Sequence, residues 1–320
     1  MARPSFEIGG VRVRPGLRRA LALPITRLVT GADVDLPIRV VHGREEGPTI
    51  WVNAAIHGDE AVGVEVVRQV LAGLDAKTLR GTVIAIPIVN VLGFMNGSRY
   101  LPDRRDLNRS FPGSARGSLA GRIAHLMMTE VVDKCTVGID LHTGSDRRTN
   151  LPQIRTDLED PETRALASAF AAPVMLHARL RDGSLRYAAR ERGAKVLLYE
   201  AGEAWRMDDW AIDAGVVGVR RVLAALDMTD PVPDDDPPAS VESWRSGWVR
   251  ARGTGMVHLD VRLGQEVTKG ERIGGLFDSL GRRVRLIHAD RDGMVVGRTE
   301  APVVNSGDAV VHIAEVGAPA

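Results

Sequence analysis

Apolar residues in the first two thirds of the chain form short runs that alternate with amphipathic stretches. The run at 49–56 is almost wholly apolar and predicts a buried strand. Residues 61–74 then place valine and leucine at helical spacing and predict an amphipathic helix. Because this succession recurs as far as residue 228, the pattern predicts an α/β fold with a mostly parallel or mixed sheet covered by helices.

The other elements follow from the same reasoning. In residues 1–48, apolar and polar residues alternate within segments that glycines separate, and this pattern predicts β structure with turns. Further strands are expected at 81–90, 137–144, 151–155, 172–178 and 195–203, and helices at 118–132, 161–170, 184–193 and 208–228. Between them, residues 91–113 form a long polar stretch without a regular pattern, which is more often a functional loop than a simple connector.

The pattern changes after residue 230. Residues 230–240 are rich in proline and aspartate and predict a linker. Beyond it only short strands and glycine turns are expected, with two similar units at 263–274 and 303–314. We therefore divide the chain into a first domain at 1–232 and an all-β domain at 233–320.

Composition narrows the class of protein. Of 320 residues, 44% are hydrophobic and 26% are charged, as in ordinary globular proteins. The net charge of +1 provides no basic field for nucleic acid or a membrane surface, and a homo-oligomer stays open. Cys135 is the single cysteine, so cysteine builds neither a disulfide within the chain nor a zinc site. Without an apolar signal segment or membrane span in this sequence, we expect a cytoplasmic protein.

Polar residues stand where predicted strands end: His57, Asn90, His142 and Glu200. Open α/β sheets bind ligands at the carboxyl ends of their strands. His57 and Glu60 lie in one turn and, with His142, offer two imidazoles and a carboxylate, a set typical of catalytic zinc with one position left for water. His-x-x-Glu alone is a common pattern, and the alternative is an exposed turn in which Asp59 caps the next helix. His125, within a predicted helix, is not expected to be a ligand.

Hydrolysis at such a metal also needs a group that takes the proton of water and returns it to the leaving amine. Glu200, at a strand end, can do both. Glu203 is a rival that spacing does not exclude, and a carboxylate that caps a turn before Gly202 is the structural alternative. Asp140, two residues before His142, would orient that histidine or be a plain buried hydrogen-bonding side chain.

The polar loop at 91–113 brings arginine and amide donors. Arginine makes bidentate contacts with carboxylates. Asn108 and Arg109 would therefore hold the carboxylate of an amino acid, and Arg99 would polarise the scissile carbonyl. In an arginine-rich chain, a solvated basic loop is the alternative. Arg186 and Arg190 precede Glu200 and are further candidates for substrate contact.

Taken together, these motifs resemble those of the succinylglutamate desuccinylase/aspartoacylase family, relatives of the zinc carboxypeptidases, over residues 45–225. The resemblance is carried by His57-Gly-Asp-Glu60, Arg99, Asp106-Leu-Asn108-Arg109, Asp140-Leu-His142-Thr-Gly144 and Glu200-Ala-Gly202. It implies a zinc carboxypeptidase-like fold, one Zn²⁺ per subunit and hydrolysis of a small N-acyl amino acid. A metallocarboxypeptidase acting on short peptides and a non-catalytic binding module stay as alternatives.

The C-terminal residues resemble a lipoyl/biotinyl-type barrel-sandwich. Carrier domains of that kind need a lysine at a hairpin tip, but the expected tip at 277–281 has none and Lys269 lies in an earlier turn. We therefore expect no attached cofactor and a role in shielding or shaping the mouth of the active site. Aspartoacylase-like members place a C-terminal tyrosine near the substrate, whereas no tyrosine follows Tyr199 here, so that mode of recognition does not carry over.

Overall fold

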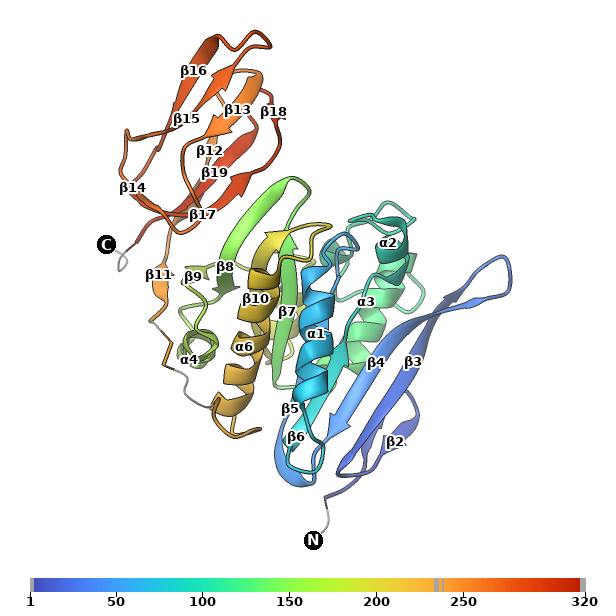
Figure 1. Cartoon of the computed structure of the whole chain (residues 1–320). Helices are drawn as coiled ribbons and strands as arrows, with labels where there is room; N and C mark the ends of the chain where they lie inside the picture. The colour runs from blue at the N-terminus through green and yellow to red at the C-terminus, as the bar shows by residue number, and fades with distance from the viewer. Residues whose placement is uncertain (1–2, 233–235, 238, 317–320) are drawn as a thin grey trace.

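A computed structural model describes residues 3–232, 236–237 and 239–316. At the centre of its large sheet, four strands run parallel to one another in the order β6 (Arg80–Ile86), β5 (Glu45–Ala54), β7 (Val137–Gly144) and β10 (Lys195–Glu203). Their carboxyl ends therefore meet at one edge of the sheet (Figure 1). The strand next to each side of this parallel centre pairs with it antiparallel, so the sheet is mixed.

The outer strands close the two sides of this parallel centre. On one side β8 (Arg148–Thr156) pairs antiparallel with β10, and β9 (Val174–His177) runs parallel beside β8. On the other side the long hairpin of β3 (Leu17–Arg27) and β4 (Asp33–His42) pairs with β6 through β4. A small hairpin of Phe6–Ile8 and Val11–Val13 precedes it, which confirms β structure in the first 48 residues.

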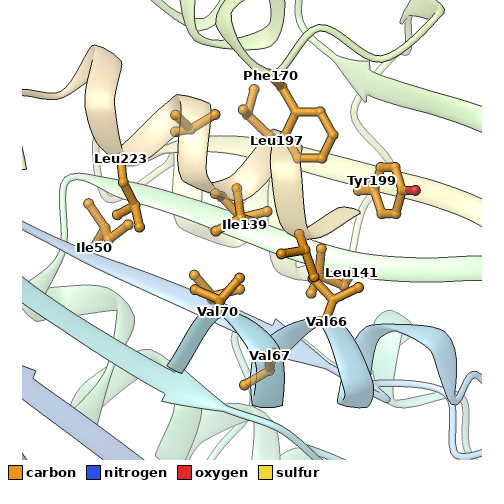
Figure 2. Packing of buried hydrophobic residues seen from close by; sticks show 14 of the residues in the cluster. Ile50, Val66, Val67, Val70, Ile139, Leu141, Phe170, Leu197, Tyr199 and Leu223 are labelled. Carbon is orange, nitrogen blue, oxygen red and sulfur yellow. The ribbon is translucent and has the colours of Figure 1, made fainter. Parts of the chain in front are cut away.

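Helices cover both faces of the sheet. One face carries α1 (Val62–Gly73), α4 (Pro161–Phe170) and α6 (Asp209–Ala225), and the other carries α3 (Leu119–Glu130) and α5 (Leu185–Arg190). In the first of these cores, apolar side chains of the helices pack onto strand residues that include Ile50, Ile139, Leu141 and Leu197 (Figure 2). The predicted bounds are confirmed for β7, β10 and α4.

The prediction that residues 91–113 lack regular structure was wrong for two stretches. They contain α2 (Val91–Asn96) and a 3-10 turn at Leu107–Arg109. Asn90 caps α2, because its Oδ1 accepts a hydrogen bond from the Gly93 amide at 2.8 Å. Gly97 ends the helix at a φ of 65°, in the left-handed region that favours glycine.

The large sheet continues into the C-terminal part of the chain. β11 (Val241–Ser243) lies parallel to β9, and β17 (Gly293–Thr299) pairs antiparallel with β8. β19 (Ala309–Ala314) and β12 (Ser246–Arg250) follow beyond β17 (Figure 1). The boundary at 232/233 stays a prediction, and residues 233–235 and 238 of the predicted linker lie outside the described residues.

A second sheet completes the C-terminal part. It contains β18 (Val303–Val304), β13 (Gly255–Leu259), β15 (Arg272–Phe277) and β16 (Arg283–His288), while β14 (Glu266–Val267) pairs with β17. The two predicted units thus have the same order of elements. In each, a two-residue strand (β14 or β18) is followed by a turn and a longer strand (β15 or β19). The two sheets enclose a core of their own. Nowhere in the described ranges is a helix both long and apolar enough to cross a membrane.

Candidate active site

The turn after β5 is held in an uncommon conformation. Ala55 has a φ of 51°, which non-glycine residues seldom adopt. Its carbonyl accepts a hydrogen bond from the backbone N–H of Asn90 at 2.8 Å. A Cβ on Gly58 would lie 2.2 Å from the carbonyl carbon of Gly93. The turn that carries His57 therefore packs directly on the backbone of α2, and only glycine fits at position 58.

The structure brings the three predicted metal ligands together. Nδ1 of His57 lies 2.7 Å from Oε1 of Glu60, and Nδ1 of His142 lies 2.7 Å from Oε2 of the same carboxylate. The ligand atoms of all three residues lie within 4.8 Å of one another, and all three side chains are buried. Two imidazole nitrogens and a carboxylate around one point are a donor set that fits a divalent zinc ion.

The other ring nitrogen of each histidine lies near a carboxylate, with hydrogen-bond geometry at His142 and without it at His57. Nε2 of His142 lies 3.0 Å from Oδ2 of Asp140, and Nε2 of His57 lies 3.3 Å from Oδ1 of Asp106. A carboxylate at Nε2 favours a proton there and leaves the Nδ1 lone pair for a metal. Of the two roles considered for Asp140, the structure shows the contact with His142, whereas the contact of Asp106 with His57 was not predicted.

A chain of buried hydrogen bonds continues behind Asp140. Nδ2 of the Asn53 side chain donates to Oδ1 of Asp140 at 2.6 Å, and the Trp51 indole donates to Oδ1 of Asn53 at 2.8 Å. Trp51, Asn53 and Asp140 are all fully buried. Asn53 and Asp140 are also register partners on β5 and β7, so the backbone fixes the separation of their side chains.

Glu60 and the two histidines shift one another's pKa values. Burial opposes ionisation of Glu60, yet His57 and His142 hold the pKa of this carboxyl well below its usual range. Burial likewise opposes protonation of His142, but Asp140 and Glu60 outweigh it and raise the pKa of this imidazole. The balance at His57 has the same sign, because Glu60 and Asp106 raise its pKa against the effect of burial. The two histidines thus favour the ionised form of Glu60 at the centre of the cluster.

Glu200 lies beside this cluster. It is the register partner of His142 on the neighbouring strand. Its Oε2 accepts a hydrogen bond from Nδ2 of Asn150 at 2.6 Å and lies 3.3 Å from Nη2 of Arg155. Asn150 and Arg155 were missed by the sequence reasoning, because they come from β8, whose antiparallel place beside β10 no local pattern indicates.

The loop before α3 supplies the three predicted donors. Nη1 of Arg99 lies 3.5 Å from Oε1 of Glu60, and its Nη2 donates to Oδ2 of Asp106 at 3.2 Å. Oδ1 of Asn108 accepts from the Leu185 amide at 2.9 Å, which joins this loop to the start of α5. Arg109 donates to the carbonyl of Asn108. These contacts hold the loop against the rest of the site.

One cavity of about 480 Å³ unites these groups, a size within the range of about 300–1,000 Å³ that is usual for small-molecule sites. All the predicted metal, catalytic and substrate residues line it: His57, Glu60, Arg99, Asn108, Arg109, His142 and Glu200. Arg186 lines it too. Asn90, Arg190 and Glu203 are not among its lining residues, and for Asn90 the structure shows a capping role instead.

The C-terminal part reaches this cavity through Trp248 of β12. The guanidinium carbon of Arg148 lies 5.3 Å from the centroid of the Trp248 ring, and the ring of His312 stacks on it at 4.8 Å. Burial lowers the pKa of His312 to about 3, and the nearby Arg155 and Arg291 act in the same direction. A C-terminal aromatic residue therefore does line the site, and it is a tryptophan rather than a tyrosine.

The parallel centre of the sheet and the buried His–Glu–His set at its carboxyl edge define an α/β protein with a candidate metal centre. Within this class, the model of the succinylglutamate desuccinylase/aspartoacylase catalytic domain matches residues 46–226. The chain belongs to this family.

Two kinds of relative support the assignment. The N-alpha-acetyl-L-2,4-diaminobutyric acid deacetylase of Halomonas elongata is 33% identical to this chain. The alignment is 336 residues long and covers 98% of this chain and 94% of that protein. A solved succinylglutamate desuccinylase/aspartoacylase from Rhodobacter sphaeroides is 27% identical with a TM-score of 0.83, covering 94% of this chain and 96% of that one. The product-bound ectoine utilization protein EutE (DoeB) of Ruegeria pomeroyi shares the fold, with 24% identity, a TM-score of 0.85 and 98% of both chains covered.

Proposed function

We propose that this protein is a zinc-dependent deacylase that hydrolyses the amide bond of a small N-acyl amino acid to a carboxylate and a free amine. The observation that carries the proposal is the convergence of His57, Glu60 and His142 on one point beside Glu200. Family membership and the deacetylase named above support the reaction class. One Zn²⁺ per subunit would be held by these two histidines and Glu60, and when bound it would activate water and polarise a carbonyl oxygen.

The side chains around that position have complementary tasks. The Glu200 carboxylate accepts a proton from the attacking water and passes it to the leaving nitrogen, so that one group acts first as base and then as acid. Arg99 donates to the carbonyl oxygen as negative charge develops there. Asn108 and Arg109 hold the α-carboxylate and so fix the amide between Glu200 and Arg99.

The experiment combines metal analysis with a substrate panel. The purified protein should contain stoichiometric zinc and should hydrolyse N-acetyl or N-succinyl amino acids in preference to dipeptides. A preference for dipeptides would indicate a metallocarboxypeptidase, and absence of both zinc and turnover would favour a non-catalytic binding module. Either outcome would replace the proposed function.

Glu200→Gln tests the mechanism, because it keeps the shape of the side chain and removes its basicity. The variant should retain zinc while its kcat falls about 100- to 10,000-fold. Glu203→Gln is the matched control, since Glu203 lies on the same strand but does not line the cavity. Full turnover by Glu200→Gln, or an equal loss in Glu203→Gln, would remove Glu200 from the mechanism.

A further inference from the structure

The proposed base Glu200 is held by one of its two carboxylate oxygens. Nδ2 of Asn150 donates to Oε2 at 2.6 Å, and Nη2 of Arg155 lies 3.3 Å from the same atom. A carboxylate oxygen has two lone-pair sites, so these two donors occupy Oε2. Oε1 accepts no hydrogen bond from any of the described residues, yet it is not a buried atom. Since Glu200 lines the cavity, Oε1 is the oxygen left open to it.

The side-chain amide of Asn150 is oriented by Glu200. Asn150 is buried, and its Oδ1 has no hydrogen-bond partner in the part of the chain that the structure describes. A buried acceptor without a partner costs free energy. The opposite orientation would set the amide oxygen against a carboxylate oxygen, so the amide nitrogen must face Glu200. The contact with Glu200 is thus made although it leaves Oδ1 of Asn150 unpaired.

The C-terminal part of the chain sets the space in which Asn150 lies. Asn150 on β8 is the register partner of Gly297 on β17, and Gly297 is in turn the register partner of His312 on β19. A Cβ at position 297 would lie 2.7 Å from Oδ1 of Asn150, and its next neighbours would be Cβ of His312 at 3.4 Å and the carbonyl oxygen of Thr149 at 3.5 Å. Because Oδ1 is the end of a side chain, an alanine at this position would displace the Asn150 amide and little else.

Resting on the proposed function, we infer that Asn150 is a positioning residue for Glu200, which holds Oε2 so that Oε1 carries out the proton transfer. Oε1 takes a proton from the attacking water as the oxygen of that water bonds to the carbonyl carbon. It returns the proton to the leaving nitrogen as the carbon–nitrogen bond breaks. A misplacement of about 1 Å can lower a rate about 100-fold, so a carboxylate that rotates freely would be a poor base. Gly297 preserves this arrangement from a strand that lies outside the hydrolase fold.

Asn150→Leu tests this role, because leucine has a similar volume and no donor. The variant should bind stoichiometric zinc. Its kcat for an N-acetyl amino acid that the wild type hydrolyses should fall about 10- to 100-fold, while KM should stay within about twofold. Thr156→Val is the matched control on the same strand, since it removes the buried hydrogen bond from Oγ1 to the Val196 carbonyl at 2.8 Å and does not change the lining of the cavity. Thr156→Val should keep the wild-type kcat.

Gly297→Ala should lower kcat in the same way without replacing any residue that lines the cavity. The φ of Gly297 is not positive, so its backbone accepts alanine and the new Cβ acts through Asn150. Gly275→Ala on β15 is the matched control, because the nearest atom to a Cβ there belongs to Phe277, at 3.2 Å, which does not line the cavity. Gly275→Ala should keep the wild-type kcat. Gly297→Ala also tests the role of Asn150 if Asn150→Leu does not fold.

Combination with Glu200→Gln separates the positioning of the base from any other effect of these substitutions. Once the base is removed, its position no longer matters. Adding Asn150→Leu or Gly297→Ala to Glu200→Gln should therefore change the residual kcat by less than about twofold.

The possible failures are distinguishable. An unchanged kcat in folded Asn150→Leu, or a full further loss on top of Glu200→Gln, overturns the positioning role. A raised KM with unchanged kcat also overturns it, because Asn150 would then be a substrate contact. An unchanged kcat in Gly297→Ala overturns the part assigned to Gly297. All of these results leave the proposed deacylase intact, whereas a zinc-loaded wild type that hydrolyses no N-acyl amino acid overturns the proposed function and this inference with it.

Discussion

Asn53 connects the packed interior of the sheet to the proposed metal site, so replacing it by leucine, of similar volume, should weaken zinc binding. In the wild type its amide donates to Asp140, and Asp140 in turn holds Nε2 of His142. Without this donor, nothing on β5 fixes the Asp140 carboxylate. Loss of a group that orients a metal ligand typically lowers metal affinity about 10- to 100-fold, which is the expected change for Asn53→Leu.

The same substitution should also lower the free energy of unfolding. The hydrogen bond from Asn53 to the buried Asp140 carboxylate contributes about 1.5–3 kcal/mol, and leaving the Trp51 indole without an acceptor adds about 1–3 kcal/mol. Trp51 cannot turn away to find another acceptor, because its ring lies on Gly138 so closely that a Cβ there would sit 2.0 Å from it. We therefore expect a total loss of about 2.5–6 kcal/mol in the free energy of unfolding.

Zinc affinity, measured by competition with a chromophoric chelator, shows whether Asn53 positions the metal ligands or only stabilises the fold. Tyr199→Phe is the control, because the Tyr199 hydroxyl is fully buried and donates to the Ala211 carbonyl at 2.7 Å, a contact that no proposed metal ligand shares. Tyr199→Phe should lower the free energy of unfolding by about 1–2 kcal/mol and leave zinc affinity unchanged. If Asn53→Leu loses no more zinc affinity than Tyr199→Phe, the positioning role is refuted.

Two further predictions concern the turn at the metal site and the acid stability of the protein. Gly58→Ala should abolish stoichiometric zinc binding, measured by metal analysis, because a Cβ there meets the backbone of Gly93 at 2.2 Å and the turn must shift. His312 is held neutral, with its pKa lowered to about 3, whereas the unfolded chain takes up its proton near pH 6.5. Its contribution to stability is therefore present above about pH 6.5 and is lost as the pH falls toward 3, at up to about 1.4 kcal/mol per unit. His312→Gln should flatten this part of the stability–pH profile, measured by chemical denaturation, and the exposed His258→Gln should not.

The part of the site that local sequence predicts is the part built by parallel strands. His57, His142 and Glu200 each follow or end an apolar run, and parallel neighbours bring such ends to one edge whatever their order in the sheet. The meeting of these three residues could therefore be predicted without knowing the order of the strands. Helix bounds were predictable for a similar reason, as at α4, where Asp160 caps the helix and Pro161 begins it.

The unpredicted part of the site comes from antiparallel and long-range pairing. Asn150 and Arg155 reach Glu200 only because β8 turns back beside β10. Trp248 reaches the cavity only because β12 joins β19 and, through β17, the edge of β8. Nothing in the local pattern of either segment specifies that neighbour, so the residues could be recognised as polar or aromatic but not assigned to the site.

This pairing also bears on why a β domain follows the hydrolase fold. Asn150, which donates to Glu200, is the register partner of Gly297 on β17. A Cβ at position 297 would lie 2.7 Å from Oδ1 of Asn150, so the absence of a side chain there leaves room for the Asn150 amide to face Glu200. The C-terminal part thus contacts Asn150, which donates to the proposed base, and lines the cavity with Trp248, so it contributes to the shape of the site.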